Sequence, residues 1–431
     1  MARVKRHVAG AVVFGTLALG GTVARSMDAP RPAVETVDAR RIREADIEFY
    51  RRRTARDTLS ARDFAELAGL YLQRGRTTAS GEDLLRAEAH ARRSLRLRAG
   101  RNGAALGTLA SALLAQHRFP EALEAARRLA ADDPASVGAR GLLGEIELEL
   151  GDYGAATRTL GGLALLRRDL GVAPRLARWE ELRGRPEMAR RILREARNDA
   201  AHRHGVPREQ VAWFHLRLGD LALRYGHLAE AERELRAGLV LAPGDYRLLG
   251  AMAGLEAARH DWPGAIEQGE AAIARALDPA TLGLVGDAYA ALGDSARAAD
   301  CYRAMEVAVL HQPGPFHRAW SLFLLDHGRD VPTVLARARE ELVSRRDIYG
   351  YDLVAWALHR SGRDDEAQAP MDSALALGTR DATLFFHAGM IARARGDDAQ
   401  AKHRLRAALE TNPFWHPLQP ATARAVLDSL R

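Results

Sequence analysis

The residues that could do chemistry are few and scattered. His202 and His204 lie two apart in the stretch AHRHG and could bind one metal ion, but two ligands are too few for a metal site, and a polar linker explains them equally well. Seven of the 15 histidines fall in the last 121 residues, which is a mild excess, and the repeat described below places them on different faces. They are His311, His317, His327, His359, His387, His403 and His416.

Other catalytic patterns are missing from the sequence. Cys301 is the single cysteine, so an internal disulfide and a cysteine-based metal cluster are excluded, and we expect it to be a small apolar residue rather than a nucleophile. Lys5 and Lys402 are the only lysines, and neither follows a phosphate-binding glycine loop. The motifs H-E-x-x-H, G-x-S-x-G and G-x-G-x-x-G do not occur. The sequence therefore predicts a protein that is not an enzyme and has no cofactor and no metal.

The charge pattern argues against nucleic acid as a partner. The formal net charge is +7, and three of the cations lie in the first six residues, which leaves +4 on the remainder. Arginines alternate with Asp and Glu, as in AERELRAGL, which is typical of a solvated helical surface with salt bridges. A nucleic-acid-binding protein usually shows a clustered basic stripe instead.

The N-terminus resembles a secretory leader. A basic start, MARVKRH, precedes an apolar stretch from Val8 to Ala24, and small residues at Thr22 and Ala24 favour cleavage after Ala24. We expect a signal peptide over 1–24 and a periplasmic or secreted protein with no stable membrane span after cleavage. Two alternatives remain open: an uncleaved N-terminal membrane anchor, and a chance apolar start in a cytoplasmic protein.

The rest of the chain carries an internal repeat of about 34 residues. Aromatic residues make up only 6% of the chain, and small aliphatic residues favour close-packed helices over sheets. A small residue recurs at intervals of 33 to 35 residues, except for two intervals of 42. These positions are Ala68, Ala110, Gly144, Ala177, Gly219, Ala253, Gly286, Ser321, Ala355 and Gly389. Twelve residues after nearly every one stands a second small residue, with Ala87 as the displaced counterpart in the first unit.

Turn residues separate the two small positions of each unit. A glycine stands seven residues after the first small position in eight units, where the C-terminus of a helix calls for a left-handed residue. These glycines are Gly75, Gly151, Gly184, Gly226, Gly293, Gly328, Gly362 and Gly396. Prolines follow at the start of the second helix as Pro120, Pro186, Pro263 and Pro332. Each unit is therefore predicted to be a helix, a tight turn and a second helix.

This pattern resembles the tetratricopeptide repeat (TPR) family. The segment LVGDAYAALGDSARAADCYRAM from Leu284 matches the family motif closely, and closing prolines appear as Pro134, Pro243 and Pro413. The resemblance implies an all-α fold, a right-handed α-solenoid of about ten helix-turn-helix repeats. The predicted regions are an N-terminal linker with an amphipathic helix over 25–57, the array over 58–413, and a C-terminal capping helix over 414–431.

The two long intervals predict insertions. One lies near RTTASGEDLL, residues 76–85, between the helices of the first unit, and the other at HRHGVPREQ, residues 202–210, between the fourth and fifth units. Insertions in repeat proteins usually form loops, so these are the two places where the array can carry something extra.

The resemblance also implies a binding groove. In the family, positions near the first small residue of each unit point into a concave face. Here these positions would place Glu145 and Asp220 in the groove, together with eight residues from the last three units. The eight residues are Arg318, Leu322, Asp352, Trp356, His359, Phe386, Met390 and Arg393. Such residue types dominate binding energy in protein interfaces, although Trp356 and Phe386 could equally be core residues between repeats.

Three functions follow from this reading. The first is a non-catalytic scaffold that binds an extended segment of a protein or peptide partner in its groove. The second is a structural subunit of an envelope complex that docks through its edges, its two insertions or its N-terminal helix. The third is a metal- or ligand-binding accessory protein of a transport system.

Overall fold

The computed structural model describes residues 39–311 and 318–430, and over these ranges the chain is helical with no strand. The leader predicted over 1–24 lies outside the described residues. None of the described helices is long and apolar enough to cross a membrane.

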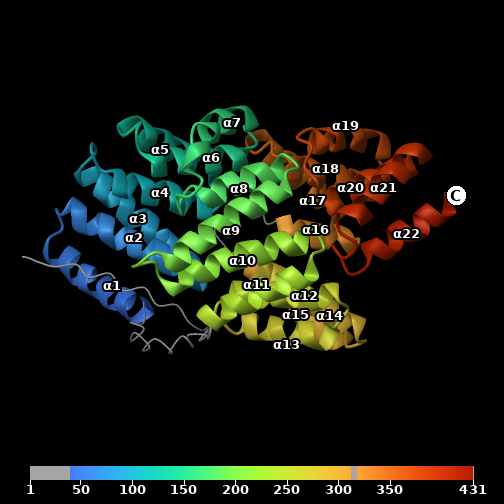
Figure 1. Cartoon of the computed structure of the whole chain (residues 1–431), viewed down its shortest axis with the longest axis horizontal. Helices are drawn as coiled ribbons and strands as arrows, with labels where there is room; N and C mark the ends of the chain where they lie inside the picture. The colour runs from blue at the N-terminus through green and yellow to red at the C-terminus, as the bar shows by residue number, and fades with distance from the viewer. Residues whose placement is uncertain (1–38, 312–317, 431) are drawn as a thin grey trace, which may run out of the picture. The chain divides into compact units, whose positions relative to one another are not determined.

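The described residues form an α-solenoid of ten helix pairs between two single helices (Figure 1). The single helices are α1 (Ala39–Arg56) and α22 (Gln419–Ser429). The first five pairs are α2 (Ala61–Thr78) with α3 (Gly81–Leu97), α4 (Gly103–Ala115) with α5 (Phe119–Asp132), α6 (Val137–Leu150) with α7 (Tyr153–Gly161), α8 (Ala173–Leu182) with α9 (Pro186–His202), and α10 (Arg208–Arg224) with α11 (Leu228–Leu241). The last five are α12 (Tyr246–Ala258) with α13 (Trp262–Ile273), α14 (Pro279–Ala291) with α15 (Ser295–His311), α16 (Arg318–Asp326) with α17 (Val331–Ser344), α18 (Ile348–Arg360) with α19 (Asp364–Leu375), and α20 (Ala382–Ala394) with α21 (Asp398–Thr411).

The recurring small residues lie where the two helices of a pair cross. Ala110, Ala253 and Ala355 are completely buried. At Gly286 an added Cβ would lie 2.3 Å from the Tyr302 ring, and at Gly144 it would lie 2.6 Å from Leu160. Larger side chains here would separate the helices, so the spacing of small residues sets the repeat. The eighth pair departs from the pattern because Thr333 is exposed and Val334 is buried in its place.

The turns follow the sequence prediction with one correction. Seven of the eight predicted glycines have the positive φ of a left-handed residue. Gly75 does not, because α2 continues to Thr78 and the left-handed residue is Ala79, with φ 54°. The four prolines each occupy the first turn of the second helix, as predicted.

The insertions are mostly absorbed into longer helices. Residues 76–85 were expected to form a loop, but only Ala79 and Ser80 separate α2 from α3, so that prediction is wrong. The extra residues extend α2 and α3 instead. In the second insertion, residues 203–207 do form a connection between α9 and α10.

The array winds back onto itself, and three turn glycines lie at the contact. A Cβ at Gly151 would lie 2.3 Å from the carbonyl oxygen of Arg346, and one at Gly184 would lie 2.3 Å from that of Gly378. A Cβ at Gly226 would lie 2.9 Å from the Asn412 side chain. We call this contact between successive turns of the solenoid the seam. Each of the three positions requires glycine for two reasons: its φ is positive, and a side chain would clash with the next turn.

Hydrogen bonds join the two sides of the seam across 188 to 197 residues of sequence. The Arg346 N–H donates to the Leu150 carbonyl at 2.9 Å, and the Ile348 N–H donates to the Tyr153 hydroxyl at 2.9 Å. Further along, the Asn412 side chain donates to the Leu223 carbonyl at 2.9 Å. In Figure 1 the orange and red helices accordingly lie beside the green ones.

Replacing a seam glycine should cost more than replacing a turn glycine that faces open space. We expect Gly396→Ala to lose about 1–2 kcal/mol of unfolding free energy, because alanine disfavours the left-handed conformation. We expect Gly184→Ala to lose roughly 1–3 kcal/mol more, because its Cβ meets the Gly378 carbonyl. The two positions have nearly equal φ, 72° and 78°, and no atom lies within 4 Å of a Cβ at Gly396. Equal losses in chemical denaturation would contradict a close-packed seam.

Candidate functional site

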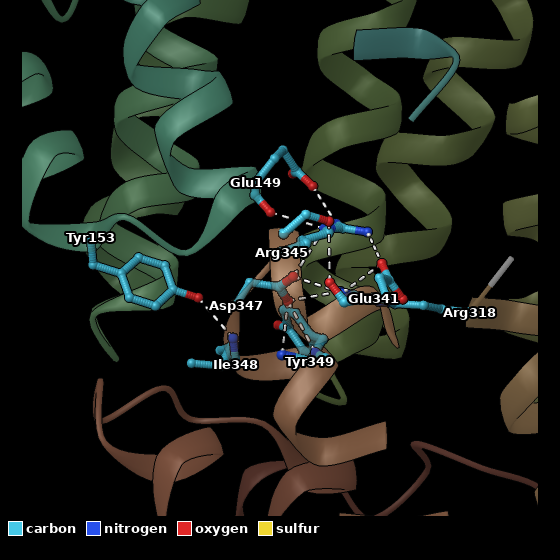
Figure 2. A network of polar contacts seen from close by, with 10 residues as sticks. Glu149, Tyr153, Arg318, Glu341, Arg345, Asp347, Ile348 and Tyr349 are labelled. Atoms are coloured by element: carbon cyan, nitrogen blue, oxygen red, sulfur yellow. Dashed lines mark hydrogen bonds and ion pairs between the residues drawn. The ribbon is translucent and has the colours of Figure 1, made fainter. Parts of the chain in front are cut away.

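Arg318, the first of the predicted groove residues, belongs to a polar network at the seam (Figure 2). Its guanidinium donates to both oxygens of Asp347 at 2.7 Å and to Glu341 at 3.1 Å. Arg345 bonds Asp347 at 2.9 Å and reaches across the seam to the Glu149 carboxylate at 2.6 Å. The network therefore ties the α17–α18 connection to the end of α6.

Opposite charges stabilise this network, whose side chains are largely buried. Burial by itself would raise the pKa of Asp347, but Arg318 and Arg345 outweigh it, and the pKa lies below its usual value. Burial would likewise lower the pKa of Arg318, and Asp347 and Glu341 raise it instead. Arg318, Arg345 and Asp347 are all paired within the chain, so Arg318 is not free to bind an anionic group of a ligand.

Trp356, Asp352 and Phe386, three more predicted groove residues, lie in the core. Their exposed fractions are 4%, 4% and 3%. Trp356 stacks on His387 with ring centroids 4.0 Å apart and donates from Nε1 to Asp326 at 3.2 Å. His387 in turn donates from Nδ1 to Asp352 at 2.9 Å. The structure therefore favours the core alternative for Trp356 and Phe386.

The remaining predicted residues are more accessible but are already paired or packed. His359 stacks on Trp356 and contacts Asp364, while Leu322 and Met390 are half-buried against the same apolar core. The Arg393 side chain is 42% exposed and pairs with Asp398 at 2.7 Å. The structure brings Trp356, His359, Asp352 and Phe386 together, and it leaves Arg318 in a separate network.

Two of the predicted groove residues, Trp356 and Arg393, should respond differently to mutation. Trp356→Ala should cost about 3–5 kcal/mol of unfolding free energy, because it opens a cavity beside His387. Arg393→Ala removes one exposed ion pair and should cost less than about 1 kcal/mol. Thermal and chemical unfolding measure both. A stable, folded Trp356→Ala variant would contradict the core placement and restore Trp356 as a binding residue.

The concave face of the middle units is closed by charged side chains. Glu181 on α8 bonds Arg178 at 2.9 Å and Arg224 on α10 at 2.7 Å. Burial would raise the pKa of Glu181, but the two arginines lower it to about 2. Asp220, which the repeat spacing places in the groove, shares this environment, and burial raises its pKa. These ion pairs line a smaller cavity of about 310 Å³, which Glu181 and Arg224 border.

A wide opening lies near the N-terminus of the described residues. It has a volume of about 1240 Å³. We call it the N-terminal cleft. Its lining comes from α1, from the end of α2 and start of α3, from the start of α10, and from the connections that follow α11 and α13. Its aromatic residues, Trp213 and Tyr246, are both half-buried.

The cleft lies where the seam is absent. No hydrogen bond or ion pair joins residues 74–86 to residues 241–275, all of which lie in the described part of the chain. Both insertions line this cleft, the first through Arg76, Thr77 and Thr78 and the second through Glu209 and Gln210. The sequence placed its main set of groove residues in the last three units and missed this cleft, although the two long intervals mark residues that line it.

The isolated reactive residues do not form a site. Four C-terminal histidines each face a different aspartate: His327 with Asp287, His359 with Asp364, His387 with Asp352, and His416 with Asp326. Among the described residues, no three or more His, Cys, Asp or Glu side chains are grouped to hold a metal ion. Cys301 is half-buried, and burial raises the pKa of its thiol, which makes it a poorer nucleophile.

Comparison with known proteins agrees with the helical repeat. Residues 113–178, from the end of α4 to the middle of α8, match the family described as Tetratricopeptide repeat. No curated protein matches the chain.

Several solved structures are similar in fold. They include the Cut9–Hcn1 hetero-tetramer of the APC/C, with 13% identity over 91% of this chain and 93% of that chain and a TM-score of 0.35. Yeast Tom70 shows 12% identity over 90% and 93%, with a TM-score of 0.36. A tetratricopeptide repeat protein from Parabacteroides merdae shows 14% identity over 64% and 98%, with a TM-score of 0.36. The match to the tetratricopeptide repeat family thus covers residues 113–178, and the function of the chain has to be inferred from its own geometry.

Proposed function

We propose that this chain is a non-catalytic scaffold that binds an extended segment of a partner protein in the N-terminal cleft. One observation carries the proposal: both length irregularities of an otherwise regular array line the same opening. Extra residues in a repeat array are tolerated where they do not disturb packing, and binding sites in such proteins lie there. The proposal combines two hypotheses from the sequence: a scaffold that binds an extended segment, and docking through the insertions and the N-terminal helix.

The lining of the cleft suits a peptide chain. Its volume exceeds the roughly 300–1,000 Å³ of a typical small-molecule pocket. Gln73, Thr77 and Gln210 offer side chains that can bond to a backbone, and Trp213 and Tyr246 offer apolar surface. Because the helices on each side are fixed by packing within their own pairs, the partner bears most of the ordering entropy on binding.

Binding at the groove residues of the last three units stays a prediction, and it would require a rearrangement of the structure. Trp356 and Phe386 are buried and Arg318 is bonded to Asp347, so a partner would reach them only if these contacts within the array broke. The N-terminal cleft needs no such rearrangement. We therefore place the binding site there.

A photo-crosslinker tests where a partner binds. We expect benzoylphenylalanine at Gln73, an exposed cleft residue, to form crosslinks to a discrete partner from an extract of the source organism. The same group at Glu306, which is exposed on α15 outside the cleft, should form none of these crosslinks. Mass spectrometry identifies the linked segment.

Two results would contradict the proposal. Crosslinks to the same partner from both positions would indicate nonspecific contact. A partner that copurifies with the full chain but crosslinks only at Glu306 would move the interface to another face. Loss of the Gln73 crosslink on adding the isolated partner segment in excess would support a single saturable site.

The same proposal includes the compartment that the leader predicts, the periplasm or the extracellular space. Mass spectrometry of the protein from its source should find an N-terminus at Arg25, after cleavage at Ala24. A membrane-bound protein that retains residues 1–24 would favour the anchored alternative. A soluble protein that retains them in the cytoplasm would reject export.

A further inference from the structure

The arginines of the N-terminal cleft are not all balanced by carboxylates. Arg74 bonds Asp83 through both of its oxygens and Glu44 at 2.7 Å, and Arg247 bonds Asp245 at 2.9 Å. Arg86 pairs with Glu82. These pairs use every carboxylate in the lining except Glu209. Positive charge is therefore left over wherever a further arginine enters the cleft.

Besides Arg40 on α1, three further arginines line the cleft: Arg43 from α1, Arg76 from α2, and Arg275 from the connection after α13. None of the three guanidinium groups has a hydrogen bond or ion pair within the described residues, and Nε of Arg43 is buried without a partner. Arg275 lies over Gly244, where a missing side chain leaves room. The lining as a whole, Arg40 included, holds seven arginines and five carboxylates, so the cleft has an excess of two positive charges.

Arg76 shows how enclosed this charge is. Burial lowers the pKa of Arg76, and the neighbouring Arg175 lowers it further. Glu145 is the nearby carboxylate, and it is already bonded to Arg175 at 2.8 Å. The Arg76 side chain is nevertheless exposed. It is a cation that points into a confined but open space, where an added anion would interact more strongly than on a flat surface.

We propose that the partner segment is acidic and that its side-chain carboxylates bind Arg43, Arg76 and Arg275. This inference rests on the proposed binding of a protein segment at the same cleft, and it adds the chemistry of that segment. Bidentate hydrogen bonds from guanidinium to carboxylate supply the contacts. The acidic side chains are internal to the segment, so no free C-terminus is needed.

A peptide fits this arrangement better than a nucleic acid does. Glu44, Glu82 and Asp245 also line the cleft, and Glu209 is unpaired. A phosphate backbone carries a charge at every nucleotide and would meet these carboxylates. A peptide can place its carboxylates opposite the arginines and uncharged residues opposite the acids.

The test uses the full chain and three fluorescein-labelled twelve-residue peptides, blocked at both ends. One alternates Glu with Ala, one Gln with Ala, and one Lys with Ala. Fluorescence anisotropy should show binding of the Glu peptide that weakens at least tenfold when salt rises from low to high concentration. The Gln and Lys peptides should bind at least tenfold more weakly than the Glu peptide.

Matched variants separate the cleft from total charge. Arg76→Gln with Arg275→Gln should weaken the Glu peptide at least tenfold, roughly the effect of losing charge-assisted hydrogen bonds. Arg236→Gln with Arg303→Gln removes the same charge from exposed positions outside the cleft and should change the affinity less than twofold. Thermal unfolding shows that both variants are folded.

Each other outcome overturns the inference in a recognisable way. If the Gln peptide binds as tightly as the Glu peptide, charge does not select the partner, while the crosslinking at Gln73 can still uphold the binding function. If none of the peptides binds, the unpaired arginines do not make an acidic-segment site. If a single-stranded oligonucleotide binds more tightly than the Glu peptide, the site belongs to nucleic acid. If the outside variant weakens binding equally, the attraction comes from overall charge.

Discussion

The close approach of successive turns at Gly151, Gly184 and Gly226 is the constraint on which the rest of the structure depends. Each glycine has a positive φ and a backbone carbonyl or side chain of the next turn where its Cβ would stand. The glycine that ends the first helix of a pair therefore also contacts the next turn of the solenoid at the seam. Because the contact is made by backbone, hydrogen bonds such as Arg346 to Leu150 can bridge it directly.

Closing the seam changes what the concave face can do. Residues from α6 to α10 and from α14 to α22 contribute to one continuous apolar core, so the turns share an interior. The charged residues that a groove would expose become internal partners, as Glu181 does with Arg178 and Arg224. Buried ion pairs of this kind are costly to break from one side, which favours a single closed arrangement of the helices.

The local fold followed from the sequence because each repeat is set by short-range chemistry. Small residues fix the crossing of two helices, and glycine and proline fix the turns, so the ten helix pairs were predictable. The turn predicted at Gly75 was wrong because α2 continues to Thr78. The seam was not predictable, because it joins residues nearly 200 positions apart and many of its side-chain bonds go to backbone carbonyls, which have no sequence signature. The placement of Trp356 and Phe386 was ambiguous for another reason: they are buried by residues of adjacent units, such as His387 and Asp326 beside Trp356.

The cleft and the irregular repeats share one cause. The seam requires that turns some five to six repeats of about 34 residues apart stay in register, and a unit of 42 residues shifts that register. The first long unit extends α2 and α3, and its turn residue is Ala79 rather than glycine. Alanine carries the Cβ that the seam glycines lack, so the backbone of the next turn cannot approach as closely there. The residues left uncovered are the polar ones of both insertions. The array therefore keeps a wide opening at the place where its sequence departs from the repeat.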